Sequence, residues 1–152
     1  MSITIHQVAI VIWLEPSVVV DSERLSRALR DLERSINFME RILSRPLDEF
    51  LNDDEAVYAL RYAVIEAVEA AVQIGLILLR ETGARPASYG EVFRMLGEGG
   101  IIPRDLAAAM RRFAGLRDLP VHRHWEVDDA RLYRELKEEG LKTLRRFLRR
   151  VH

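Results

Sequence analysis

A long, regular stripe of apolar residues is the feature that most constrains the fold of this chain. Between residues 25 and 43, apolar side chains recur at intervals of four, three, four, three and four residues, which places them on one face of an α-helix. These positions are Leu25, Leu29, Leu32, Ile36, Met39 and Leu43. Asp21 or Ser22 is suited to cap the start of this helix, and Arg45-Pro46 to stop it. A helix with one apolar face must bury that face, so the chain needs further helices to pack against it.

A second helix is predicted from a cap at residues 52–54 to about Arg80. Its apolar positions include Val57, Leu60, Val64, Val68, Val72 and Leu79. Between Ala67 and Leu79 it is apolar on more than one face, which is typical of a helix surrounded by others. We therefore expect it to be the central helix of the domain.

The remainder of the chain contains three more helical segments. Ser88 and Glu91 have the spacing of a capping box before a short helix that ends at Leu96, and Pro103 suits the first turn of the next helix, which runs to about Leu116. Asp128 or Asp129 is expected to cap the last helix, and Gly140 interrupts it. Residues 117–127 lack clean periodicity and are expected to form a turn or a kinked connection. The prediction is an all-α, up-and-down bundle of about five helices over residues 21–152.

Residues 1–20 have a different pattern and are expected to form an apolar arm. Their β-branched side chains partly alternate, which favours one or two short strands or, with equal weight, a loosely ordered extension. The apolar run Val8–Leu14 is too short to span a membrane, and no Lys or Arg precedes Arg24 to begin a secretion signal. We expect a cytoplasmic protein in which this arm adds to a subunit interface.

Charge is distributed unevenly along the chain. Residues 1–110 contain 11 Arg and 17 Asp or Glu, a net charge of −6, whereas residues 111–152 contain 12 Arg or Lys and 7 Asp or Glu, a net charge of +5. The overall charge of −1 therefore hides a basic C-terminal segment that is compatible with nucleic acid. The absence of cysteine excludes disulfides, a thiol nucleophile and a zinc site built on sulfur.

The densest cluster of titratable side chains lies between the last two predicted helices, over residues 117–126. It contains Arg117, Asp118, His122, His124 and Glu126. Alternation of His122, His124 and Glu126 would place them on one face of an extended segment, as partial ligands of a metal ion, but further ligands would have to come from elsewhere. In a structural interpretation, Arg117 pairs with an acidic residue and His122 is an interior histidine. In a third interpretation, the site cleaves an RNA phosphodiester: histidine transfers protons and arginine binds the phosphate. The 2′-hydroxyl of the RNA itself is then the nucleophile.

Spacing alone does not decide among these interpretations. With 21 Arg and 4 His in 152 residues, chance supplies about half of one Arg-x4-His pair. The order of features from Asp54 to Phe147, however, resembles the HepT toxin branch of the HEPN superfamily. The segments that carry the resemblance are 56–61 (AVYALR), 83–89 (GARPASY), 100–102 (GII), 113–118 (FAGLRD) and 121–128 (VHRHWEVD).

The resemblance implies a metal-independent endoribonuclease toxin, without cofactor, whose site forms where two subunits of a homodimer meet. Arg117 would orient and stabilise the phosphate, His122 would act as general base or acid, and the second subunit's His122 would supply the complementary role. Asp118 stands where the family often has Asn, and is expected to orient its neighbour. The products would carry a 2′,3′-cyclic phosphate and a 5′-hydroxyl. A nucleotidyltransferase antitoxin of the MNT type would neutralise the toxin.

Two positions depart from the family pattern. HepT proteins usually have His-x-Tyr, and the antitoxin attaches AMP to that Tyr, whereas this chain has His124, without a hydroxyl. Pro120 also lies within the motif, where it removes a backbone donor and restricts Leu119. Two alternatives therefore stand beside the ribonuclease: a catalytically inactive HEPN module that binds a nucleotidyltransferase or a nucleotide, and a plain helical dimer in which Arg117 and His122 are structural.

Overall fold

The computed structural model describes residues 16–123, 125 and 127–152, without the side chains of residues 16–20 and His122. Every regular element in this part of the chain is helical, as predicted. The elements are α2 (Pro16–Leu43), α3 (Leu47–Leu51), α4 (Asp54–Leu79), the 3₁₀ turn η1 (Arg80–Thr82), α5 (Tyr89–Glu98), α6 (Arg104–Leu116), α7 (Asp118–His122), α8 (Asp129–Glu135), the π-helical turn η3 (Leu136–Gly140) and α9 (Leu141–Val151).

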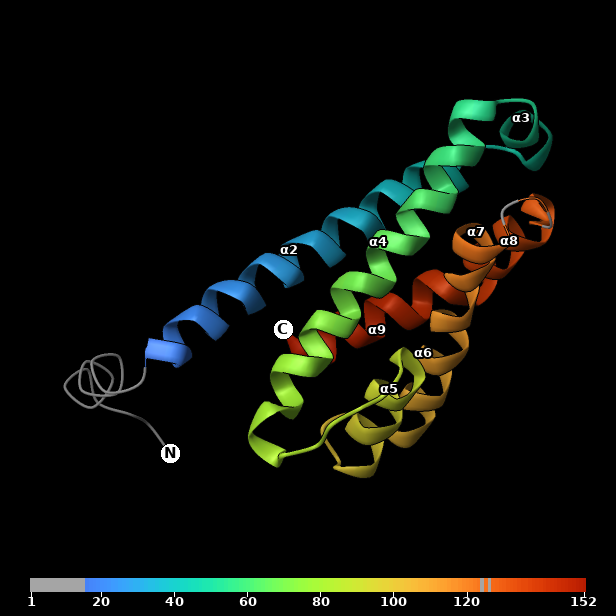
Figure 1. The fold of residues 1–152 in the computed structure, drawn as a ribbon. Coiled ribbons are helices and arrows are strands. Elements are labelled where there is room, and N and C mark those ends of the chain that lie inside the picture. Colours follow the sequence, from blue (N-terminus) through green and yellow to red (C-terminus); the bar gives the residue numbers. More distant parts are fainter. Residues whose placement is uncertain (1–15, 124, 126) are drawn as a thin grey trace.

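The bundle is built on two long helices. α2 and α4 run side by side in opposite directions, the α5–α6 hairpin packs beside α4, and α9 contacts both α2 and α6 (Figure 1). The predicted stripe on α2 faces the core, and Leu32, Ile36 and Met39 are fully buried. Burial of such side chains is the main favourable term in folding, so the stripe accounts for the position of α2.

The N-terminal boundary of the first helix was predicted wrongly. α2 begins at Pro16, so Val18–Val20 belong to the helix and not to an arm. Proline is favoured in the first turn, where its missing N–H donor would have no acceptor. Asp21 lies inside the helix and forms an ion pair with Arg80, just after α4. The strand or extension expected for residues 1–15 lies outside the described residues.

α4 is the central helix, as predicted. Half of its 26 residues are buried, and they lie on several of its faces. Close packing on α5 depends on Gly75, because a Cβ atom at that position would lie 2.4 Å from Cγ1 of Val92. The segment Asp54–Thr82 is long and apolar enough to cross a membrane. However, 56% of its most apolar 18-residue stretch is buried inside the domain, as is typical of a core helix.

The connection after α6 is more ordered than predicted. Arg117 keeps helical backbone angles (φ −64°, ψ −31°), and the short helix α7 follows it directly. Pro120 is the third residue of α7, in the first turn, where a missing N–H costs no helical hydrogen bond. The last predicted helix is confirmed as α8 and α9, joined in line by η3 at Gly140.

Three caps predicted from the sequence are present, and the first is Asp53, which accepts a hydrogen bond from the Ala56 N–H (3.2 Å) at the start of α4. Ser88 Oγ accepts a hydrogen bond from the Glu91 N–H (3.2 Å), and Asp128 accepts one from the Arg131 N–H (3.0 Å). Asp129, next to the cap residue Asp128, receives two hydrogen bonds from Arg61 of α4, at 2.8 and 2.7 Å. This pair fixes the start of α8 against α4.

Candidate functional site

Arg117 occupies the junction of α6 and α7 and extends toward α4. Its Nη2 donates a hydrogen bond to Oε1 of Glu69 (3.0 Å), and its guanidinium lies over the ring of Tyr89, 5.0 Å from the centroid. Only 21% of its side chain is exposed. The helical backbone at Arg117 and the contact between α7 and α4 together set this direction.

Three elements converge on the carboxylate of Glu69. The hydroxyl of Tyr89, the first residue of α5, donates to both Glu69 oxygens, at 2.8 and 2.7 Å. With Arg117, these contacts form a cluster from α4, α5 and the α6–α7 junction, which we call the Arg117 cluster. Glu69 and Tyr89 restrict the guanidinium in position and in plane, as expected of a group that has to meet a substrate in one orientation.

Hydrogen bonding to Glu69 raises the pKa of Tyr89, and burial and the negative charge of Glu69 act in the same direction. An ionised Tyr89 would lose that hydrogen bond and face a carboxylate, so its hydroxyl stays protonated at neutral pH. Tyr89 therefore serves as a donor and a stacking surface, and not as a base.

The guanidinium of Arg117 retains donor capacity. Its Nε is buried and has no hydrogen-bond partner among the described residues. A buried donor without an acceptor is unusual in a folded protein. Nε is covered and out of reach of a ligand, but the Nη1 donors, which form no hydrogen bond with a described residue, remain for an oxygen-bearing ligand.

Asp118, predicted to orient its neighbour, lies at the margin of the cluster. Its Oδ1 is 3.7 Å from Nη1 of Arg117, and 65% of its side chain is exposed. Glu69 is the closer and less exposed partner of Arg117. An orienting role of Asp118 stays a prediction, and the stronger restraint comes from a residue that the motif did not indicate.

Glu69 was missed because it lies 48 residues from Arg117 in sequence. One signal could have indicated it: Glu66 and Glu69 are the only charged residues between Tyr62 and Leu79, in the most apolar part of the chain. A carboxylate in such a helix needs a partner, and arginine is the most frequent one for a partly buried site.

His122 is the last residue of α7, five positions after Arg117 and about 7.5 Å further along the helical axis. The structure describes its backbone only. His124 and Glu126 lie outside the described residues, and so does most of the metal site considered above. Among the residues that are described, no group of three His, Asp or Glu side chains is placed to hold a metal ion.

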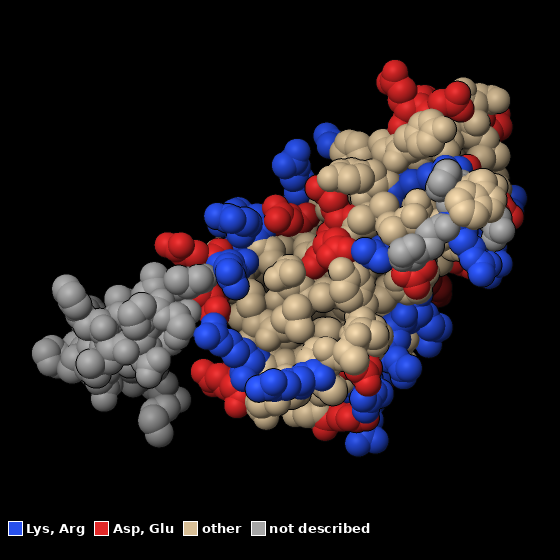
Figure 2. Space-filling model, viewed as in Figure 1, with Lys and Arg blue, Asp and Glu red and all other residues tan. Residues whose placement is uncertain are grey.

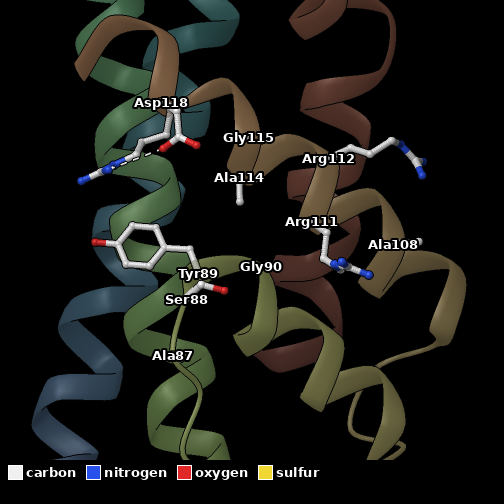
Figure 3. A pocket seen from close by; sticks show the side chains of 11 residues that line it. Ala87, Ser88, Tyr89, Gly90, Ala108, Arg111, Arg112, Ala114, Gly115 and Asp118 are labelled. Atoms are coloured by element: carbon white, nitrogen blue, oxygen red, sulfur yellow. Dashed lines mark ion pairs between the residues drawn. The ribbon is translucent and has the colours of Figure 1, made fainter. Parts of the chain in front are cut away.

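A pocket of about 810 Å³ opens beside the Arg117 cluster. Figure 3 shows Tyr89 and Asp118 on one side of it, Arg111 and Arg112 on α6 at the other, and the small residues Ala114 and Gly115 between them. The pocket therefore joins the start of α5, one side of α6 and Arg117.

A second feature is an exposed aromatic face on α4 that reaches the same site. Tyr58 is 67% exposed and Tyr62 61% exposed, and a step of seven residues, about two helical turns, leads from Tyr62 to Glu69 on the same face. Leu119 and Val121 of α7 are also exposed, and Trp125 is 69% exposed. Figure 2 shows uncharged residues over much of this view, interrupted near the middle by acidic and a few basic side chains and bordered by charged ones. Exposed apolar groups at this density indicate a contact surface.

Comparisons with known proteins agree on one family. The family described as Ribonuclease HepT-like matches residues 32–151. A protein of Archaeoglobus fulgidus named "Putative RNase" is 32% identical over 90 residues, which are 59% of this chain and 67% of the relative. A second protein of the same name and organism is 26% identical over 113 residues, or 74% of this chain and 84% of the relative.

Solved structures show the same fold. A chain of the complex between tri-AMPylated Shewanella oneidensis HEPN toxin and MNT antitoxin superposes with a TM-score of 0.76, at 17% identity, over 84% of this chain and 96% of that one. A chain of a toxin–antitoxin complex with AMP-PNP gives 0.75, also at 17% identity, over 85% and 98%. A cytosolic protein of unknown function from Bacillus subtilis gives 0.64, at 17% identity, over 80% and 86%.

Proposed function

The chain belongs to the HepT-like ribonuclease family, and from this premise we propose that it is a metal-independent endoribonuclease of the HEPN type. It acts as a cytoplasmic toxin that an MNT-type nucleotidyltransferase antitoxin neutralises. The single observation that carries the proposal is the Arg117 cluster, because Glu69 and Tyr89 hold the motif arginine beside a pocket and leave part of its donor capacity unused.

The proposed reaction needs only groups that the chain and RNA supply. A general base removes the proton of the 2′-hydroxyl, and the 2′-oxygen attacks the adjacent phosphorus. The bond from phosphorus to the 5′-oxygen breaks, and a general acid protonates that oxygen, giving a 2′,3′-cyclic phosphate and a 5′-hydroxyl. Arg117 stabilises the charge that develops on the phosphoryl oxygens. His122 provides one proton transfer and His122 of the partner subunit the other.

The proposal includes a homodimer, which the placement of the site at one end of the exposed face of α4 supports. Glu69 shares that face with Tyr58 and Tyr62, and α7, which ends at His122, packs against α4. A second subunit on this face would cover the tyrosines and bring its own α7 toward Arg117. The proposed site is therefore completed by the same contact that buries the apolar surface.

Cleavage of RNA in the presence of EDTA tests the reaction. We expect the purified protein to cleave RNA under these conditions, and His122→Ala to lower kcat by about 10²- to 10⁴-fold. Cleavage unaffected by both His122→Ala and Arg117→Ala would remove the site assignment. Cleavage abolished by EDTA would favour the metal site instead.

The dimer has its own test. Tyr62→Asp places a charge on the proposed interface, and we expect a monomer in sedimentation and a loss of cleavage. Arg34→Asp, on a charged face of α2 away from Tyr62, is the control and should leave the protein dimeric. A wild-type protein that is monomeric at micromolar concentration would contradict the composite site.

One observation favours the second candidate, an inactive HEPN module that binds a nucleotidyltransferase or a nucleotide. The ion pair with Glu69 occupies part of the guanidinium that the reaction requires. Such a module would bind its partner as well as the wild type does when Arg117 and His122 are both replaced by Ala, and neither form would cleave RNA. Relief of growth arrest by a co-expressed nucleotidyltransferase, with arrest dependent on His122, would instead support the toxin.

A further inference from the structure

The pocket beside the Arg117 cluster is hollow because small residues line it. Gly90, Ala108, Ala114 and Gly115 form part of its wall. A Cβ atom added at Gly115 would meet nothing within 4 Å, so this side of α6 opens directly into the cavity. A concave site with a small-residue floor can admit a compact group, such as a phosphate, close to the helix backbone.

Two arginines at this pocket have no partner in the part of the chain that the structure describes. Arg111 and Arg112 are exposed, and neither forms an ion pair or side-chain hydrogen bond with any described residue. Two arginines on α9 are different in this respect, because Arg145 pairs with the carboxylate of Glu40 and Arg146 with that of Asp105. The charges of Arg111 and Arg112 are therefore available to an incoming anion.

The other polar groups at the pocket do not cancel this charge. Asp118 is the one carboxylate among the described residues that line it, against Arg111, Arg112 and Arg117. Glu91, in the first turn of α5, is already engaged by the Ala87 N–H and by Arg94. The pocket is thus positively charged, which favours an anionic ligand.

Spacing along the helix relates the pocket to the proposed reaction. Arg111 and Arg117 are six residues apart, about 9 Å along the helical axis. A nucleic acid strand advances by about 3.4 Å per nucleotide when its bases are stacked as in B-form DNA. A strand whose scissile phosphate lies at Arg117 can therefore bring a neighbouring phosphate, within about three nucleotides, to Arg111.

We propose that the pocket between α5 and α6 is a subsite for the RNA backbone, in which Arg111 and Arg112 bind phosphates flanking the bond that is cleaved. The proposal rests on the proposed ribonuclease function for the identity of the ligand. An acidic protein surface is the competing occupant, but a hollow with a glycine at its floor suits a narrow, phosphate-bearing strand better than a flat protein surface. These arginines position substrate and take no part in proton transfer.

Binding of a non-cleavable, 2′-O-methylated RNA to the full-length protein tests the subsite without requiring activity. For Arg111→Ala/Arg112→Ala we expect a Kd about 10-fold higher. The slope of log Kd against log salt concentration should become shallower by about 1.4, which is the value for the loss of two phosphate contacts on a single strand. The matched control is Arg149→Ala/Arg150→Ala, an exposed Arg-Arg pair at the end of α9, which should change Kd by less than about twofold.

A second variant separates the pocket from general electrostatic attraction. Gly115→Leu fills the hollow and keeps every arginine, and the space around a Cβ at this position lets the fold accept it. We expect weaker RNA binding with a thermal melting temperature no lower than that of the wild type. Unchanged binding by Gly115→Leu, or equal losses in the two double-arginine variants, would overturn the subsite.

Cleavage kinetics keep the subsite distinct from the proposed function. If the wild type cleaves RNA, Arg111→Ala/Arg112→Ala should raise KM and leave kcat nearly unchanged, whereas an unchanged KM would overturn the subsite. If the wild type does not cleave RNA, the proposed function fails, and Arg111-dependent binding of the 2′-O-methylated RNA would still support the subsite. Loss of antitoxin binding with RNA binding intact would assign the two arginines to a protein partner.

Discussion

Arg117 and Arg111 lie less than two turns apart on one helical path, yet their surroundings are opposite. Arg117 is held between a carboxylate and an aromatic ring, and most of its side chain is covered. Arg111 is exposed, and no described residue pairs with it. A fixed guanidinium can discriminate between geometries, whereas a free one contributes mainly charge. The difference separates a residue that orients the reacting phosphate from one that only attracts the strand.

Exchange of arginine for lysine at the two positions tests this difference most strongly. Lysine keeps the charge but loses the planar fork of donors. We expect Arg117→Lys to lower kcat by about 10²-fold or more, similar to the loss of one donor to a transition state, and Arg111→Lys to change kcat and KM by less than about threefold. Steady-state cleavage of one RNA by both variants gives the comparison. Equal effects at the two positions would mean that Arg117 acts through charge alone.

Glu69→Gln weakens the restraint on Arg117 while keeping the size of the side chain. We expect kcat to fall by roughly 10-fold with little change in KM, because a neutral amide holds a guanidinium less firmly than a carboxylate does. The same substitution should lower the pKa of Tyr89, since the hydrogen bond to the carboxylate is the main cause of its elevation. Ultraviolet titration of the tyrosines measures this second effect, which a change in overall stability would not reproduce. A pKa of Tyr89 that stays where it was would show that Glu69 does not hold the cluster.

The ion pair of Arg61 with Asp129 tests how much an arginine fixed by a carboxylate, but outside the lining of the pocket, contributes to the stability of the fold. Its side chains are about as covered as that of Arg117, and hydrogen bonding to Asp129 raises the pKa of Arg61. Asp129→Ala removes the Asp129 carboxylate from this guanidinium, so we expect a loss of about 1–3 kcal/mol in the free energy of unfolding, measured by urea denaturation. An unchanged free energy of unfolding would contradict this stabilising role of the pair.

Arg146 is a paired arginine at the surface, and its replacement should have the smallest effect of the four. Its hydrogen bond to Asp105 holds the pKa of that carboxyl below its ordinary value. A lowered pKa in the folded state stabilises the fold above the ordinary pKa of an aspartate, and this stabilisation is lost as pH falls through the folded value. Thermal melts from pH 6 to pH 2 should therefore show a slightly smaller loss of melting temperature for Arg146→Ala than for the wild type. High salt should remove the difference, because the pair is exposed.

The fold could be predicted largely from local pattern, and the site only in part. A stripe such as the one on α2 indicates which face of the helix is buried. The capping residues Ser88 and Asp128 indicate where helices begin, because each bonds to a residue only three positions further along the chain. The restraint on Arg117 involves Glu69 and Tyr89, which are distant in sequence and meet only after α4, α5 and α6 have packed. The start of α2 was misplaced because β-branched residues near Pro16 imitate a strand, while continuity with a packed helix overrides that preference.

α4 combines three tasks in one helix: it fills the core, carries Glu69 and presents Tyr58 and Tyr62 outward. Each residue inserted into a helix turns everything beyond it by about 100°. One insertion after Val64 would therefore remove Glu69 from Arg117 and Gly75 from Val92 together, while the tyrosines before it kept their direction. Natural length variation in relatives of this protein should consequently fall in the connections between helices and spare the middle of α4.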